Sequence, residues 1–251
     1  MSMLEAQGVT KRFGALAAVD SVDFTIEQGE ILGLIGPNGA GKTTLVNVMA
    51  GSEPITAGTV QFKGRNITTW PAYKVAEIGI GRTFQIPKPL ERMNVLENVM
   101  VGALFGRAQR PRDMRHVREL AHQTLHLVGL EGKASFAVGA LTVADRKRVE
   151  LAKALAMDPE LLLLDEVMAG LNPVEMEKVM DLIRQINAKG VTILVIEHVM
   201  KAVMGLCNRI LVVHHGKRIA LGTPQVICDD DRVIEAYLGE KYAAAKAQRA
   251  Q

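Results

Sequence analysis

Apolar and polar positions along this chain predict buried strands that alternate with helices. Segments 30–35, 160–166 and 191–196 are rich in Leu, Ile and Val, which is typical of strands covered on both faces. The helices predicted to follow them are 44–50, 175–189 and 200–206. Strands that alternate with helices in this order predict an α/β fold with a mainly parallel central sheet.

The N-terminal part of the chain shows a different pattern. Stretches 3–10 and 18–26 alternate apolar and polar residues, which predicts two antiparallel strands around a turn at 11–14. Residues 57–67 predict a second hairpin. We therefore expect an antiparallel β subdomain at the N-terminus, followed by a short strand that ends on Gln85.

A helical block interrupts the α/β pattern. Asn94 is a predicted cap, 112–128 forms an amphipathic basic segment, and 146–157 predicts a further helix. We expect one domain at 1–240, with a catalytic α/β lobe at 1–86 and 158–240, a helical subdomain at 87–157 and a flexible tail at 241–251.

Composition narrows the class of protein. The chain has 251 residues, 48% of them hydrophobic, which is enough for one large domain. Its net charge of +3 does not indicate a nucleic-acid partner. Its two cysteines lack metal-site spacing and suggest a reducing compartment. We find no N-terminal pattern of a signal peptide and no apolar run long enough to span a bilayer. We therefore expect a protein that is soluble when isolated and that binds a membrane through partner proteins.

Residues 36–44 carry the most specific motif in the chain. They match G-x-x-x-x-G-K-[ST] between a predicted strand and a predicted helix, the context in which this pattern binds phosphate. Glycines let several backbone N–H groups point at one anion, and the helix start adds its positive dipole end. Lys42 would reach the β- and γ-phosphates and Thr43 would bind Mg²⁺. The predicted loop comprises Gly36, Pro37, Asn38, Gly39, Ala40, Gly41, Lys42, Thr43 and Thr44.

Polar residues follow other predicted strands of the same sheet. Gln85, Asp165, Glu166 and His198 all stand at carboxyl ends, where an open α/β sheet binds its ligands. Asp165 suits Mg²⁺ held through water, and Glu166 suits a group that polarises an attacking water. His198 either hydrogen-bonds a γ-phosphate or is structural. Phe13 is either a core residue or a flat surface for a purine ring.

Together these motifs resemble the ATP-binding subunits of ABC transporters, over about residues 4–240. The resemblance implies a P-loop NTPase fold with ATP and Mg²⁺ as cofactors. It implies that Phe13 stacks on adenine and that Gln85 contacts Mg²⁺ and signals to the membrane subunit. It also implies that Asp165 is the Walker B acid, Glu166 the catalytic glutamate and His198 the switch histidine. The catalytic residues would then be Glu166, His198 and Lys42. The residues that bind the metal would be Thr43, Gln85 and Asp165.

Several stretches narrow the resemblance to one branch of that family. Residues 12–14, 81–85, 170–173, 196–200 and 233–239 are similar to the ATPases of branched-chain and hydrophobic amino acid importers. This implies import of a small organic solute. It also implies two transmembrane permease subunits, a second ATPase subunit in a homodimer or heterodimer, and indirectly a periplasmic or extracellular solute-binding protein. The protein would then lie at the cytoplasmic face of the inner or plasma membrane.

One segment departs from the family pattern. The family's Leu-Ser-Gly-Gly-Gln signature closes over ATP held by the opposite subunit, and here it reads Leu141, Thr142, Val143, Ala144, Asp145. Val143 places a branched side chain where the backbone should approach phosphate closely. Asp145 adds a negative charge, which is unfavourable unless it is neutralised. We expect the site completed by this segment to be weak and the site formed by the chain's own loop and acids to be intact.

Two other functions stay open from the sequence. One is a nucleotide-binding subunit with weak or no turnover, because the signature segment 141–145 is altered. The other is an ATP-gated clamp without a membrane partner. Relatives of that kind carry long coiled-coil inserts or two fused ATPase units, whereas this chain has one unit and a short insert. Turnover of the purified chain, with its partner ATPase present, would separate the first of these from a transport ATPase.

Overall fold

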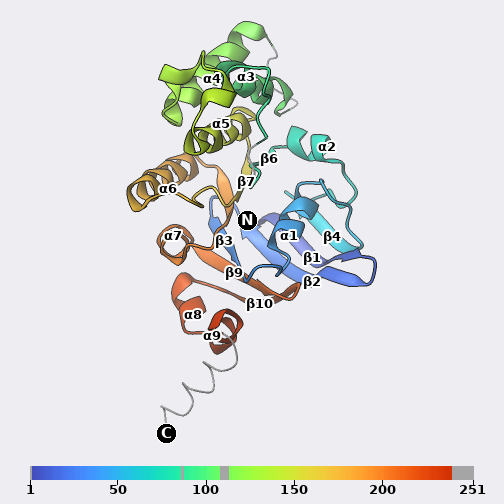
Figure 1. Cartoon of the computed structure of the whole chain (residues 1–251). Helices are drawn as coiled ribbons and strands as arrows, with labels where there is room; N and C mark the ends of the chain where they lie inside the picture. Colours follow the sequence, from blue (N-terminus) through green and yellow to red (C-terminus); the bar gives the residue numbers. More distant parts are fainter. Residues whose placement is uncertain (1, 86–87, 108–112, 239–251) are drawn as a thin grey trace. The chain divides into compact units, whose positions relative to one another are not determined.

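Two compact units make up the structure, a computed structural model that describes residues 2–85, 88–107 and 113–238. The first unit combines Met1–Thr69 with Leu194–Gln251, and the second comprises Trp70–Ile193. Figure 1 shows the chain from blue at its N-terminus to red near its C-terminus. In sequence terms, the second unit is an insertion in the first.

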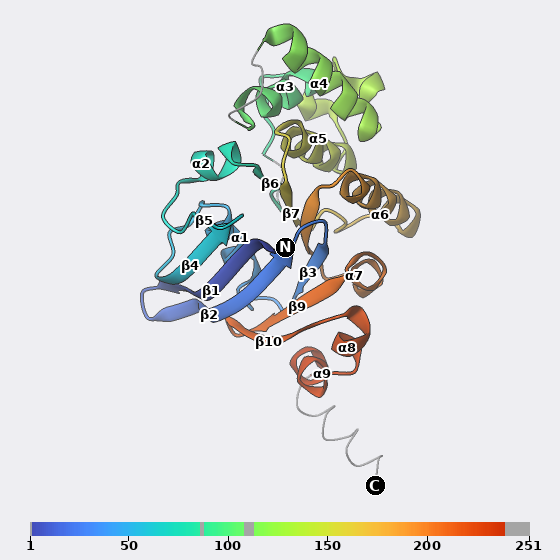
Figure 2. The same ribbon diagram turned by 180° about the vertical axis from the view of Figure 1, so that it is seen from behind.

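An antiparallel sheet with the order β2-β1-β4-β5 forms one part of the first unit (Figure 2). Its strands are β1 (Ser2–Phe13), β2 (Leu16–Glu27), β4 (Ala57–Phe62) and β5 (Arg65–Asn66). The predicted turn at 11–14 is wrong in its position, because Phe13 still pairs with Leu16 and the chain reverses at Gly14 and Ala15. Gly14 has a φ of 59°, a backbone conformation that glycine adopts without strain.

The other part of the first unit holds a parallel pair, β3 (Ile31–Ile35) with β9 (Arg209–His214), extended by the antiparallel strand β10 (Lys217–Gly222). Strand β8 (Thr192–Ile196) contributes residues to both units. The helices of this unit are α1 (Lys42–Met49), α7 (Met200–Leu206), α8 (Pro224–Cys228) and α9 (Asp231–Leu238). Every residue of β3 is buried, as its continuous apolar pattern predicts.

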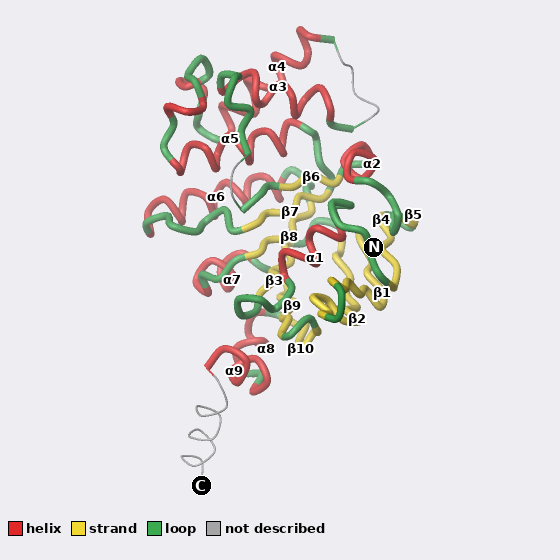
Figure 3. Tube along the Cα trace, turned by 45° about the vertical axis from the view of Figure 1, so that its right-hand side comes forward, coloured by secondary structure: helices red, strands yellow, loops and turns green. Residues whose placement is uncertain are grey.

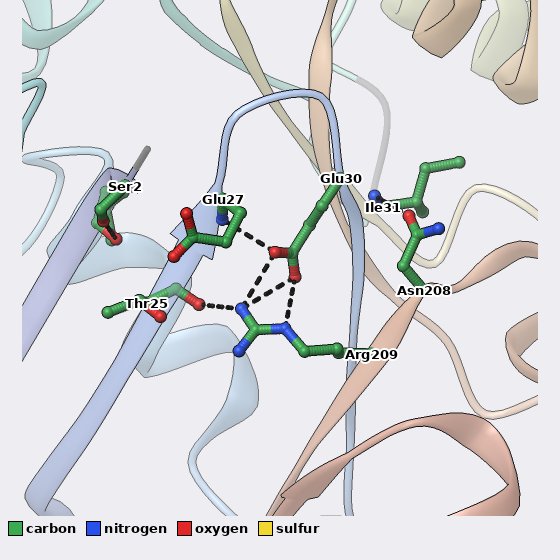
Figure 4. A network of polar contacts seen from close by, with 8 residues as sticks. Ser2, Thr25, Glu27, Glu30, Ile31, Asn208 and Arg209 are labelled. Atoms are coloured by element: carbon green, nitrogen blue, oxygen red, sulfur yellow. Dashed lines mark hydrogen bonds and ion pairs between the residues drawn. The ribbon is translucent and has the colours of Figure 1, made fainter.

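An ion pair fixes the start of β3. The Arg209 guanidinium donates to both carboxylate oxygens of Glu30, at 2.9 and 3.1 Å from Nη2, and to the Thr25 carbonyl at 2.9 Å. Figure 4 shows this network, in which the Glu27 N–H also reaches Glu30. Asn208 accepts from the Ile31 N–H at 2.7 Å. Because Glu30 is 8% exposed and its carboxylate is held by two donors from one guanidinium, the strand that leads to the phosphate loop is anchored at its base.

The second unit contains the parallel pair β6 (Ile80–Arg82) and β7 (Leu161–Asp165) together with a group of helices. The helices are α2 (Ala72–Glu77), α3 (Val95–Phe105), α4 (Met114–Leu127), α5 (Val143–Ala156) and α6 (Pro173–Ala188), with short 3₁₀ turns at Glu131–Lys133 and Val138–Ala140. Helices α3, α4 and α5 pack on one another (Figure 1). Their contact buries side chains such as Val99, Ala121, Leu125 and Val149.

Three boundaries in this unit differ from the sequence predictions. The short strand predicted to end on Gln85 is only Ile80–Arg82, so Gln85 lies beyond its end. Strand β7 stops at Asp165, which leaves Glu166 outside it. The helix predicted at 146–157 begins at Val143, because Thr142 caps it by accepting a hydrogen bond from the Asp145 N–H.

The proposed division into a catalytic lobe and a helical subdomain at 87–157 stays a prediction, and the predicted tail at 241–251 lies outside the described residues. Among the residues that the structure describes, none of the helices combines the length and the hydrophobicity that crossing a bilayer requires.

Candidate functional site

The loop between β3 and α1 has the backbone that the glycine motif requires (Figure 3). Gly36, Gly39 and Gly41 have φ values of 153°, 78° and 98°. A Cβ at Gly36 would lie 2.1 Å from the Val213 carbonyl oxygen, and one at Gly41 would lie 2.2 Å from that of Ala18. No other residue fits at these two positions without moving the backbone. The glycines therefore allow the loop to pack closely against the backbone at Val213 and Ala18.

Lys42 begins α1 and lies over this loop. Its ammonium donates to the Gly36 carbonyl at 2.7 Å and to the Pro37 carbonyl at 3.0 Å, and the residue is 9% exposed. Helix α1 has no side-chain cap and no acidic residue in its first turn. Its N-terminal N–H groups and the lysine therefore form an electropositive cradle that suits a phosphate group.

Tyr237 in α9 also contacts the loop. Burial raises the pKa of Tyr237, and a hydrogen bond from the Gly36 backbone N–H to its phenol oxygen partly offsets this effect. Tyr237 is not among the site residues predicted from the sequence. It lies within the 233–239 motif, which is the feature of the sequence that could have indicated it. Tyr237 thus lies next to the first glycine of the loop.

Phe13 ends β1 and is not in a turn. Its ring is 49% exposed, and the Lys11 ammonium lies 4.7 Å from the ring centroid. Lys11 is itself held by the Pro54 carbonyl at 2.9 Å and by Glu53 at 3.2 Å. The exposure excludes the reading of Phe13 as a core residue and leaves an aromatic face on which a purine ring could stack.

Asp165 closes β7 and is 2% exposed. The Thr83 hydroxyl accepts from its backbone N–H at 3.1 Å, which fixes the end of the strand. Burial lowers the pKa of the Arg82 guanidinium, and the charge of Asp165 partly offsets that effect. An ionised carboxylate at this position is therefore supported by a nearby cation.

Glu166 follows with a φ of 49°, which is unusual for a residue with a side chain. Because Glu166 stands outside β7, this left-handed backbone and not the strand sets where its side chain starts. The Gln85 amide nitrogen donates to Glu166 Oε2 at 2.8 Å. The structure therefore brings Gln85 and Glu166 together, as the prediction of a shared site requires.

His198 is exposed and lies just after β8, beyond the end of that strand. The structure thus places Phe13, the loop 36–44 and His198 in the first unit, and Gln85, Asp165 and Glu166 in the second. Assembly of these two groups into one nucleotide site stays a prediction.

The signature segment forms the start of α5. Val143 is 70% exposed, whereas Asp145 is 6% exposed. Asp145 contacts the Lys133 ammonium at 2.5 Å, the Thr142 hydroxyl at 3.0 Å and Arg148 at 3.9 Å. Burial opposes ionisation of Asp145, but the hydrogen bonds from Lys133 and Thr142 and the charges of Lys133 and Arg148 outweigh it, so its pKa is lowered. The negative charge expected to repel phosphate is therefore neutralised by Lys133 and Arg148, which lie outside the segment, and Val143 is the stronger departure.

Comparisons with known proteins cover nearly the whole chain. A model of the ABC transporter family matches residues 19–169, and a model of the branched-chain amino acid ATP-binding cassette transporter matches residues 217–243. The high-affinity branched-chain amino acid transport ATP-binding protein LivG of Salmonella typhimurium is 39% identical over 250 residues, which cover 95% of this chain and 98% of that protein. The protein BraF of Pseudomonas aeruginosa, which carries the same description, is 38% identical with the same coverage.

A solved structure agrees with these matches. The ADP conformation of an ATP-binding cassette from an ABC transporter has a TM-score of 0.85 at 32% identity, covering 96% of this chain and 100% of that one. The predicted P-loop NTPase fold is thereby confirmed. A family match over more than half of the chain, together with relatives of this identity along almost its full length, shows that the chain belongs to the ABC transporter family of ATP-binding proteins.

Proposed function

We propose that this chain binds and hydrolyses ATP to drive an importer for branched-chain amino acids or a related small organic solute. The observation that carries this proposal is the glycine loop with Lys42 over it, at the start of an uncapped helix. The full-length similarity to branched-chain amino acid transport ATP-binding proteins supports the solute class. The alternative of a subunit without turnover is not favoured, because both acids needed for hydrolysis are present.

The side chains proposed for Mg²⁺ fit that ion. Asp165 offers a buried carboxylate, Thr43 a hydroxyl at the helix start, and Gln85 an amide oxygen opposite the nitrogen that binds Glu166. Among the described residues, no group of three or more His, Cys, Asp or Glu could hold a metal. Mg²⁺ is bound in proteins through one or two carboxylates and completes its shell with phosphate oxygens and water. When bound, Mg²⁺ neutralises charge on the transferring phosphoryl group.

The chain's own residues would perform the remaining steps. The loop N–H groups and Lys42 bind the phosphates, and Phe13 stacks on the adenine. Glu166, oriented by Gln85, accepts a hydrogen bond from the attacking water and polarises it. His198 would contact the γ-phosphate and report its loss.

We further propose that two membrane permease subunits, a second ATPase and a solute-binding protein complete the transporter, with this chain at the cytoplasmic face. The altered signature segment supports a pair of unlike ATPases. In such a pair, the partner supplies an intact signature to this chain's loop, whereas segment 141–145 gives the partner's nucleotide a poorer contact.

Restoring the glycines should strengthen that poorer contact. In a reconstituted transporter, the double variant Val143→Gly/Ala144→Gly should raise the ATPase rate severalfold, because the exposed valine side chain no longer separates the backbone from phosphate. The rate is measured by phosphate release at saturating ATP. A matched control is Val226→Gly, which removes another exposed valine from a helix and should leave the rate unchanged. An unchanged or lower rate in a folded double variant would contradict the role given to this segment.

Uptake of labelled solute tests the proposed function directly. Liposomes that contain this chain with its permease and ATPase partners should accumulate labelled leucine, isoleucine or valine when ATP is enclosed and the binding protein is supplied. Unlabelled branched-chain amino acids should compete. If ATP is hydrolysed but no amino acid accumulates, the assignment of solute class fails while the assignment of ATPase activity survives.

A further inference from the structure

Lys147 in α5 binds the backbone of the turn that follows β7. Its ammonium donates to the Ala169 carbonyl at 2.6 Å and to the Glu166 carbonyl at 3.1 Å. These contacts hold the main chain of the turn that starts at Glu166. All three residues lie in the second unit.

The turn that carries Glu166 needs such support. Glu166 has a φ of 49°, a conformation that a residue with a side chain adopts at a cost and holds only where its surroundings require it. Within the turn, the Ala169 N–H donates to the Glu166 carbonyl at 3.3 Å, a long hydrogen bond. The Lys147 ammonium bridges the two carbonyls at the ends of this turn and so holds both with one charged group.

The two ends of Glu166 are thus held by different partners. Its carboxylate accepts from Gln85 at 2.8 Å, and its carbonyl accepts from Lys147. Gln85, Lys147, Asp165 and Glu166 line the same small cavity. A shift of Lys147 would therefore rotate the backbone of Glu166. The direction of the Glu166 carboxylate decides whether it can contact the attacking water.

Lys147 is also joined to the signature segment. Helix α5 starts at Val143, capped by Thr142, and Lys147 stands one helical turn further on the same face. Asp145, on another face, is fixed by Lys133 and Arg148. The first turns of α5 therefore carry the signature segment at their start and, one turn later, the Lys147 ammonium next to the Glu166 turn.

We propose that Lys147 is a positioning residue for Glu166 and that it connects the signature segment of this chain to its own hydrolytic acid. The inference rests on the proposed role of Glu166 as the group that polarises water. Engagement of the signature segment with a nucleotide on the partner ATPase then sets the position of Lys147, and through it the turn at Glu166.

Replacement of Lys147 tests this connection. Lys147→Met should lower kcat for ATP by about tenfold to a hundredfold, because small displacements of a catalytic group cost rates of this order. The dissociation constant for ATP, measured with a fluorescent analogue and by competition, should stay within about twofold, since the role proposed for Lys147 is to position Glu166 for the chemical step and not to bind the nucleotide. Lys147→Arg keeps the cationic donors and should recover most of the rate. Lys178→Met, an exposed lysine on α6, is the matched control and should behave as the wild type.

Two further measurements separate positioning from a general structural role. Amide hydrogen exchange should speed up in peptides that span 165–171 of Lys147→Met and stay unchanged in α1. The effects of Lys147→Met and Val143→Gly/Ala144→Gly on kcat should be non-additive if the two segments are coupled. If Lys147→Met does not fold, Lys147→Gln, which keeps one amide donor, is measured by the same criteria.

The outcomes are distinct. A wild-type complex that hydrolyses no ATP would overturn the proposed function. An active wild type with unchanged kcat in Lys147→Met, or equal losses in Lys147→Met and Lys147→Arg, would overturn the positioning role alone. Strict additivity with the signature variant would overturn the connection between the two segments.

Discussion

Replacing Glu166 with glutamine is expected to lower steady-state ATP turnover by about 10²–10⁴-fold, the range that general-base catalysis contributes. Glutamine has nearly the same shape, and its amide oxygen can still accept the hydrogen bond that Gln85 donates at 2.8 Å. The substitution therefore removes the negative charge that polarises water while it leaves the local geometry in place. ATP should remain bound without being hydrolysed, which rapid filtration with labelled ATP would detect.

The control for this substitution is Glu119→Gln. Glu119 is an exposed acid on α4 of the same unit, and its variant should turn over ATP at the wild-type rate. If Glu166→Gln hydrolysed ATP as fast as the wild type, another group would have to activate the water, and the role given to Glu166 would be wrong.

Replacing Lys42 with methionine should abolish measurable nucleotide binding at ordinary concentrations. A hydrogen bond to a charged group contributes about 1.5–3 kcal/mol, and each 1.4 kcal/mol is a factor of ten in affinity, so the loss is about tenfold to a hundredfold per phosphate contact. In the structure the ammonium also bridges the Gly36 and Pro37 carbonyls, so the empty loop should loosen as well. Fluorescence of a labelled ATP analogue measures the change, and Lys74→Met on α2 is a control with an exposed lysine.

The same variant gives a thermal readout. A ligand that binds only the folded state raises its melting temperature, so ATP should stabilise the wild type and the Lys74 variant but not Lys42→Met. Equal stabilisation of all three proteins would show that the nucleotide binds elsewhere.

Elements with one dominant pattern were predictable from the sequence. Strands β3 and β8 lie within one residue of the predicted segments, because continuous Leu, Ile and Val runs have few other stable placements. Helix α7 matches its predicted range, Met200–Leu206. The order of these elements predicted the α/β fold with a mainly parallel sheet, and the resemblance to ABC ATPases implied the P-loop NTPase fold, which the comparisons confirm.

Boundaries set by single side chains were not predictable in the same way. Pairing of Phe13 with Leu16 extends the first hairpin past the expected turn. The Thr142 side chain starts α5 earlier than the apolar spacing suggests. Asn172 caps α6 together with Glu175, which explains the start of that helix at Pro173.

The contacts that organise the site depend on residues distant in the sequence. Gln85 meets Glu166 across 81 positions, and Lys147 reaches the turn at Glu166 from 19 positions away. No periodicity or motif specifies such pairs, because they follow from how strands and helices pack. The neutralisation of the Asp145 charge is equally hard to predict, because it depends on Lys133, which lies twelve positions earlier in the chain.

Titration calorimetry of the intact, folded chain with Mg-ATP measures directly whether loop 36–44 binds a triphosphate. A saturable heat with one nucleotide per chain is expected, which disappears in Lys42→Met and persists in Glu166→Gln. A folded wild-type protein that shows no uptake of Mg-ATP, or that binds it equally well after Lys42→Met, would contradict the account.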